Sequence, residues 1–380
     1  HVSYLVELKQ LVKDKTLTET ESLYVGMALM WAEPYASIEY LNQAEGGHST
    51  GAIVRLLRAH AYANASLDST DEKETRDFAE EALRNAELAR ADIPDSQFAI
   101  MREFAANFNY ALICRRYQDA RGKEFIKRAR DLQGELSRDV ASNNSVHYQF
   151  LIEFGDKSDA LDFVNALNGR ELVDYLRIYR MFTEIHEGNI ENVQDDFNSF
   201  VYHREFREPI AQLVELAHGV PRDRRESIHK RYSNNLSARL AREEFDTLEF
   251  SWALAKLLEA EKGLSVNRAL TEANLNKVRK CIRDCEGTYI AHIYQPMLDI
   301  ETMSPEQVIE ENKFSRRRLS VACFAAGIQT LADGKPASEA VKFFQRCTED
   351  GFPIFYTYAF SHAMVERLGN EMTGYYWCDE

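Results

Sequence analysis

Two cysteines and a histidine in the C-terminal half of the chain have the residue types of a zinc site. Cys281 and Cys285 would lie one turn apart on a helix, and His292 follows them. Thiolate and imidazole are ligands that Zn²⁺ prefers in proteins. No fourth ligand follows at a recognisable spacing, and two cysteines one turn apart also suit a buried helix face. We expect a core helix and no bound cofactor, with a metal site at Cys281, Cys285 and His292 as the alternative.

Other catalytic and nucleotide-binding motifs are incomplete or missing in the sequence. Residues 46–53 have the glycine spacing of a phosphate-binding loop, but Ala52 and Ile53 stand where a Lys and a Ser or Thr are needed. Paired carboxylates such as Glu80 and Glu81 come with no predicted cleft, so we expect them on solvated helix faces. No nucleophile elbow, kinase motif or dinucleotide fingerprint occurs. The sequence therefore predicts a protein that is not an enzyme.

A short basic run could be a phosphorylation site. Residues 316–320 read Arg-Arg-Arg-Leu-Ser, which contains the Arg-Arg-x-Ser core that basophilic kinases accept. A phosphate on Ser320 would sit at the start of a helix predicted over 319–332, where the helix dipole favours negative charge. Matches this short also arise by chance. In the alternative, the Arg triplet lies on a solvated or acid-pairing helix face.

An aromatic, charge-free stretch near the C-terminus could contact a ligand or a partner. Residues 351–365 carry no formal charge, and Tyr358 and His362 lie one helical turn apart within them. A helix that is apolar all round is normally buried, so we expect a core helix in which His362 bonds to a neighbour. The candidates for partner binding are these two residues and a following aromatic group that either caps the fold or contacts a partner: Tyr358, His362, Tyr375, Tyr376 and Trp377.

Composition and charge exclude several classes of protein. The chain has 380 residues, 45% apolar and 11% aromatic, so it can bury a large core and is too long for one compact nucleus. Its 8 prolines and 17 glycines are few, which favours helices over turn-rich β folds. The net charge of −15 would repel nucleic acid or an anionic membrane surface. We expect a helical protein that binds no nucleic acid.

The sequence predicts a cytoplasmic protein. No segment has the roughly 20 apolar residues that a membrane span needs. Six cysteines in a chain of this length do not form a disulfide framework, which fits a reducing compartment. Glu7 and Lys9 interrupt any secretory signal, although the chain begins with His1 rather than Met and an N-terminal targeting signal could be missing.

Apolar residues recur at helical spacing along the chain, whereas strand-like alternation is short-lived. A clear example is the set Phe245, Leu248, Trp252, Ala255 and Leu258, whose members are three or four residues apart. The predicted helices form pairs joined by short turns, with an irregular spacing of roughly 35 to 50 residues. The pairs are 52–67 with 72–91, 97–117 with 120–137, 172–187 with 190–203, 240–262 with 271–285, and 317–333 with 336–349.

The last of these pairs resembles the tetratricopeptide repeat. That pattern has a large-small pair in its first helix, a later glycine, an alanine and an aromatic in its second helix, a small residue and a closing proline. The matching residues are Ala326-Gly327, Gly334, Glu339-Ala340, Phe344, Cys347 and Pro353. The resemblance is clear over about 317–369 and partial over 52–94. The turn has one extra residue, and Cys323 and Thr330 stand where the family prefers bulky aromatics.

The resemblance implies an all-α fold, an α-solenoid of stacked antiparallel helix pairs that form a right-handed superhelix. Proteins of this family display a concave groove that holds a peptide or a helix of another protein. One well-known groove type grips a C-terminal carboxylate with Lys and Asn. The corresponding positions here fall near the apolar residues Val321, Phe324, Ala325 and Ile328, so no such clamp is expected in this repeat.

A weak change of composition around 217–221 predicts a domain boundary. We expect an N-terminal helical-repeat region over 1–216 and a C-terminal tetratricopeptide-like region over 217–380, or one continuous superhelix. The predicted function is a non-enzymatic scaffold for a protein or peptide partner, in a larger bacterial signalling protein and with self-association through the C-terminal end. The alternative is a small-ligand sensor whose aromatics and histidines line an internal pocket.

Overall fold

The computed structural model is helical throughout the part of the chain that it describes. That part comprises residues 8, 10–13, 15–30, 33–44, 51–137, 140–141, 145–154, 252–253, 256–257, 272, 275–276, 278–280, 282–283, 289–351, 357–358, 360–361 and 364–365. All regular elements in these ranges are α-helices and none is a strand, which confirms the all-α prediction for them. The chain divides into two compact units, His1–Phe163 and Val164–Glu380, and each is described by itself.

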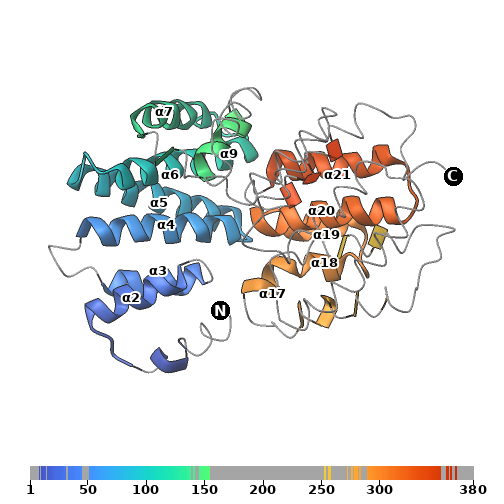
Figure 1. The fold of residues 1–380 in the computed structure, drawn as a ribbon, viewed down its shortest axis with the longest axis horizontal. Helices are drawn as coiled ribbons and strands as arrows, with labels where there is room; N and C mark the ends of the chain where they lie inside the picture. Colours follow the sequence, from blue (N-terminus) through green and yellow to red (C-terminus); the bar gives the residue numbers. More distant parts are fainter. Residues whose placement is uncertain are drawn as a thin grey trace, which may run out of the picture. The chain divides into compact units, whose positions relative to one another are not determined.

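The first unit contains helices that follow one another closely along the chain (Figure 1). Its described helices are α2 (Glu19–Leu29), α3 (Pro34–Gln43), α4 (Gly51–Asp68), α5 (Glu72–Asp92), α6 (Gln97–Arg116), α7 (Gly122–Glu135) and α9 (Ser145–Phe154). From α2 to α7, each helix packs against the next one, and α4 also contacts α6. The pairs predicted over 52–91 and 97–137 are confirmed as α4 with α5 and α6 with α7.

Side chains next to the helix starts determine where three of these helices begin. The Thr18 hydroxyl accepts from the Glu21 N–H at 3.3 Å, and the Glu21 carboxylate accepts from the Thr18 N–H at 2.8 Å, which forms a capping box for α2. Asp71 and Ser96 accept from backbone N–H groups in the first turns of α5 and α6. Each cap pairs a donor that the helix itself leaves unpaired.

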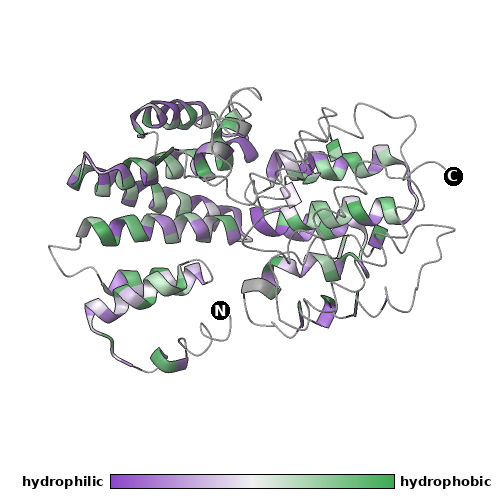
Figure 2. Ribbon diagram, in the orientation of Figure 1, coloured by the Kyte–Doolittle hydropathy of each residue, from purple (hydrophilic) through white to green (hydrophobic). Residues whose placement is uncertain are grey.

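Small side chains let α4, α5 and α6 approach one another closely. In Figure 2 the helices of this unit are apolar along part of their surface and polar along the rest. Ala86 of α5 packs with Ala59 of α4 and Ala106 of α6, and all three are buried. Two turns earlier on α5, Ala79 packs with Tyr110 of α6. Alanine favours the helical conformation and has a small side chain. The same alanines therefore stabilise these helices and allow them to pack closely against one another.

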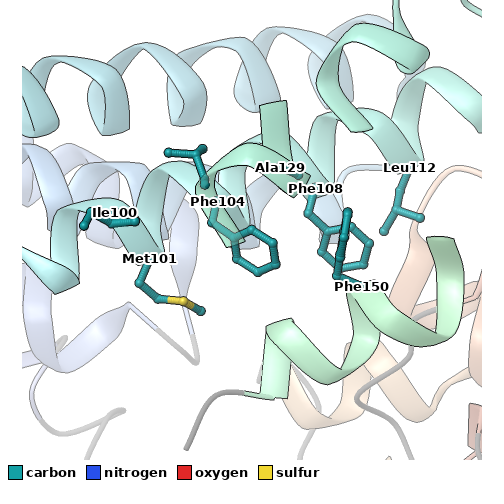
Figure 3. Close-up of a cluster of buried hydrophobic side chains, with 8 residues drawn as sticks. Ile100, Met101, Phe104, Phe108, Leu112, Ala129 and Phe150 are labelled. Atoms are coloured by element: carbon teal, nitrogen blue, oxygen red, sulfur yellow. The ribbon is translucent and has the colours of Figure 1, made fainter. Parts of the chain in front are cut away.

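An aromatic cluster connects α6 to α9 (Figure 3). Phe104 and Phe108 lie one turn apart on α6, and each ring stands edge-to-face with Phe150 of α9, at centroid distances of 5.3 and 5.6 Å. Ala129 of α7 belongs to the same buried cluster. Edge-to-face packing is the arrangement that the charge distribution of aromatic rings favours. The cluster thus joins α6, α7 and α9.

One aspartate holds the turn between α6 and α7. Gln118 in this turn has a φ of 54°, and among the described residues it is the one non-glycine with a positive φ. The Asp119 carboxylate accepts from the Arg121 backbone N–H at 3.0 Å and from its guanidinium at 2.7 Å. Arg76 of α5 reaches the same carboxylate at 3.3 Å. Hydrogen bonds from the side chain and then the backbone of Arg121 lower the pKa of Asp119 to about 2.

We predict that Asp119→Asn destabilises the protein at neutral pH and that this loss shrinks in acid. The folded-state pKa lies below the ordinary value of 3.8, so the carboxylate stabilises the fold above that value and the contribution is lost as the pH falls toward 2. Urea denaturation at several pH values measures the difference. As a control, Glu81→Gln breaks an exposed pair with Arg84 and should cost less than about 0.5 kcal/mol. A loss that does not change with pH would contradict the prediction.

In the second unit, one helix contacts all the other described helices. The helices are α17 (Tyr289–Tyr294), α18 (Pro296–Asp299), α19 (Pro305–Asn312), α20 (Arg316–Ala332) and α21 (Ala337–Asp350). α20 packs against each of the others, and the pair predicted over 317–349 is confirmed as α20 with α21. The predicted pair 172–203 and the predicted boundary at 217–221 lie outside the described residues. No described helix is both long and apolar enough to span a membrane.

A glycine terminates α20 directly after the helix that is predicted over 317–333. Gly334 has a φ of 69°, in the left-handed region that glycine adopts most easily. Its N–H donates to the Leu331 carbonyl at 3.0 Å, and the N–H of Lys335 donates to the Thr330 carbonyl at 3.2 Å. These two bonds form a Schellman motif, which pairs carbonyls that the helix end leaves free. Pro336 lies directly before the first residue of α21. Because proline has no backbone N–H, the helix does not continue toward the N-terminus through this residue.

The Phe344 ring of α21 sits against Gly327 of α20. A Cβ built on Gly327 would lie 2.5 Å from two carbons of that ring, far closer than two carbon atoms can approach. Phe344 is fully buried, and its ring centroid is 6.1 Å from that of Phe360. The absence of a side chain at Gly327 therefore allows α20 and α21 to pack with an aromatic ring between them.

We expect Gly327→Ala to lower the free energy of unfolding by about 1–3 kcal/mol, because the ring or the helix must move within a packed core. The matched control is Gly134→Ala in α7, where a Cβ would meet nothing within 4 Å. That change should be neutral or stabilise by up to about 1 kcal/mol. Urea denaturation followed by circular dichroism measures both. Equal effects of the two substitutions on the free energy of unfolding would show that the Phe344 ring does not constrain the packing of α20 against α21.

Candidate functional site

The arginines at the start of α20 are buried. Arg316 and Arg317 are only 3% and 4% exposed, so the expectation of a solvated helix face is wrong for them. The Arg316 guanidinium donates to the backbone carbonyls of Asp350 and Gly351 at the end of α21. Such carbonyls lack partners within the helix and carry the negative end of its dipole. Backbone carbonyls at the end of one helix thus accept hydrogen bonds from a buried cation of another.

Ser320, the predicted phosphorylation site, lies inside this packing. Because α20 begins at Arg316, Ser320 is in the second turn rather than at the helix start. Its side chain is fully buried, and the hydroxyl donates to the Arg316 carbonyl at 3.1 Å. A Cβ built on Gly351 would lie 2.7 Å from the Ser320 oxygen, so backbone crowds the hydroxyl. A kinase could reach this hydroxyl only after α20 and the end of α21 separate.

His292, the histidine of the predicted metal site, lies near a cation. It belongs to α17, where burial and, to a lesser extent, the positive charge of Arg318 lower the pKa of its ring. A positive charge that acts on the imidazole also disfavours a metal cation there. Cys281 and Cys285 lie outside the described residues. Within the described ranges, no three His, Cys, Asp or Glu side chains gather as they would around a metal ion.

Arg318 has acids within electrostatic reach but no hydrogen bond at Nε. The side chain is partly buried, and its Nε atom is closed off from solvent. Burial lowers the pKa of Arg318, while the negative charges of Asp299 and Glu311 oppose that change. The charge of this arginine is therefore partly compensated by neighbouring helices.

Tyr358 is the C-terminal aromatic candidate that the structure describes. It is 2% exposed, so its ring belongs to the core. The neighbouring Phe360 packs edge-to-face with Phe324 of α20 at a centroid distance of 5.4 Å. Tyr358 cannot touch a partner while this packing holds. The other four candidates lie outside the described residues: His362, Tyr375, Tyr376 and Trp377.

Polar side chains connect α4 to α6 in the first unit. The Asn109 amide of α6 donates to the Ser66 hydroxyl of α4 at 2.9 Å, and both residues are buried. Two turns earlier on α6, Nη1 of Arg102 contacts Nδ1 of His60. Because a guanidinium can only donate, Nδ1 of His60 is the acceptor, as in a neutral imidazole. These contacts differ from the alanine-rich contacts that α5 makes with α4 and α6.

Arg102 is the residue of this group with the clearest capacity to bind a ligand. Its side chain is partly buried, and burial lowers the pKa of the guanidinium to about 10, so it stays charged at neutral pH. A guanidinium can bind a carboxylate or a phosphate with two parallel hydrogen bonds. Sequence reasoning missed the contact because His60 and Arg102 are 42 residues apart and belong to no local motif.

We predict that a basophilic kinase phosphorylates Ser320 in the folded chain at least about tenfold more slowly than in a peptide of residues 312–324. The hydroxyl is fully buried, so the reaction requires local opening of the helix pair. Mass spectrometry of both substrates over time measures the rates, with Ser320→Ala versions of each as controls for other sites. Equal rates in chain and peptide would show that this part of α20 is open in solution.

Comparison with known proteins assigns the chain to no family. No family model matches it, no curated protein matches it, and no solved structure matches it. A functional assignment therefore rests on the residues and contacts described above, in particular on the order of the helix contacts and on the polar groups between α4 and α6.

Proposed function

We propose that this chain is a non-enzymatic scaffold of the tetratricopeptide-like type, an α-solenoid whose surface binds a protein or a peptide. The observation that carries the proposal is the order of the helix contacts. From α2 to α7 each helix packs against its neighbour in sequence, and α4 also contacts α6. In a solenoid each unit contacts only its neighbours, and stacking extends a shared core. The contact order of the first unit is what such stacking produces.

A recurring contact between a glycine and a bulky side chain gives further support. A Cβ on Gly26 of α2 would lie 2.7 Å from Leu41 of α3, just as one on Gly327 of α20 would lie 2.5 Å from Phe344 of α21. In both units, therefore, the first helix of a pair has a glycine where the second helix approaches. Gly327 and Phe344 are also two of the residues that carry the resemblance to the tetratricopeptide repeat.

Large apolar side chains on the surface of the first unit are available to a partner. Phe98 of α6 is 77% exposed, and on α2 Tyr24 is 66% and Met27 is 42% exposed. Aromatic side chains are enriched among the residues that carry binding energy in interfaces. Single exposed apolar residues are also common on monomers, so substitutions at these positions test the proposal.

Direct binding measurements test the scaffold role. Proteins captured by the tagged full chain are purified and titrated into the purified chain in a calorimeter. We expect at least one to bind with defined stoichiometry, and Phe98→Ala or the double change Tyr24→Ala with Met27→Ala to weaken it by about tenfold or more. The control Leu88→Ala removes a 42% exposed side chain of α5 and should leave the affinity unchanged.

The proposal is wrong if none of the captured proteins binds the purified chain directly. It is also wrong if the chain chemically alters the protein that it binds, because a scaffold releases its partner unchanged. A place for this chain in a larger bacterial signalling protein stays a prediction, which the partner's identity would address.

A further inference from the structure

Arg102 differs from the other arginines of α4 to α7. Each of the others contacts a carboxylate, a backbone carbonyl or an aromatic ring. Arg55 pairs with Asp92, for example, and Arg58 donates to backbone carbonyls. In the described structure, the polar contact of Arg102 is with the neutral nitrogen of His60. Among the described residues, therefore, no acid contacts this partly buried positive charge.

A shortage of acidic residues in the chain does not explain why no described acid pairs with Arg102. The chain has 61 Asp and Glu residues against 46 Lys and Arg. Glu103 is adjacent in sequence, but successive residues point about 100° apart around a helix, and the charges that act on Glu103 come from Arg90, Glu87 and their neighbours on α5 and α7. Burial alone shifts the pKa of Arg102, with no acid opposing it. Arg318 differs, because Asp299 and Glu311 lie within reach of its charge.

The contact with His60 leaves the ligand-binding side of the guanidinium available. The contact uses Nη1, whereas Nε and Nη2 are the two donors that together grip an oxyanion. In the described part of the chain, neither Nε nor Nη2 of Arg102 makes a hydrogen bond. Neither of these atoms is fully buried, in contrast to Nε of Arg318, which is both fully buried and unpaired. His60 is buried between α4 and α6, so its ring can hold the plane of the guanidinium in place.

We infer that Arg102 and His60 form an oxyanion-binding site between α4 and α6. His60 orients the guanidinium, and Nε and Nη2 donate to the two oxygens of a carboxylate or of a phosphate group. The ligand is a small molecule or a side chain that carries such a group. This site goes beyond the proposed scaffold role and does not depend on it, because an inorganic anion is sufficient to occupy it.

Nuclear magnetic resonance of the arginine Nε–H groups of the full chain tests the site. Sodium phosphate or sodium acetate is titrated at constant ionic strength, with chloride as the balancing anion. We expect one arginine signal to shift until it saturates, and that signal to be missing from the spectrum of Arg102→Lys. Backbone signals of α6 should report binding to this variant that is at least about tenfold weaker, because lysine cannot bind an oxyanion with a fork of donors.

The matched control is Arg84→Lys, which changes a 64% exposed arginine of α5 and should leave the titration unchanged. If Arg102→Lys does not fold, His60→Phe keeps the arginine and an aromatic ring but removes the acceptor, and it should also weaken binding. Shifts that never saturate, or that are the same in wild type and in these variants, would overturn the inference. Saturation with only one of the two anions identifies the ligand as a phosphate or as a carboxylate.

Discussion

Close contact between neighbouring helices is the constraint on which the rest of the structure depends. Ala86 lies where α5 meets both α4 and α6, and Gly327 lies where α20 meets the Phe344 ring. Helices can approach this closely only where one side chain is very small, so a few alanines and glycines determine which faces meet. The larger side chains around them then fill the remaining space, as the aromatic cluster of α6 and α9 does.

The same close packing determines how buried charges are paired. Arg58 of α4 donates to the carbonyls of Leu41 and Asn42 at the end of α3, at 3.3 and 3.4 Å, and Arg316 of α20 donates to carbonyls at the end of α21. In both units a buried arginine of one helix thus completes the last turn of another. Helix ends leave carbonyls unpaired, and where packing excludes water a side chain must take its place.

Most chemically reactive side chains of the described core therefore have structural roles. Burial raises the pKa of the Cys347 thiol to about 12, which keeps it protonated and unreactive as a nucleophile. The Ser320 hydroxyl bonds to its own helix. Arg102 is different, because among the described residues its charge is neither paired with an acid nor used to complete a helix end.

For the predicted pairs over 52–91, 97–137 and 317–349, the sequence by itself determined where the helices lie, because caps, apolar spacing and the Gly334 turn depend on residues only a few positions apart. It did not predict that Arg316 and Ser320 are buried, nor that His60 meets Arg102. Those features were decided by the tertiary structure. An arginine-rich turn looks solvated until other helices cover it, and a contact over 42 residues leaves no local pattern, since burial and polar pairing depend on which helix faces meet.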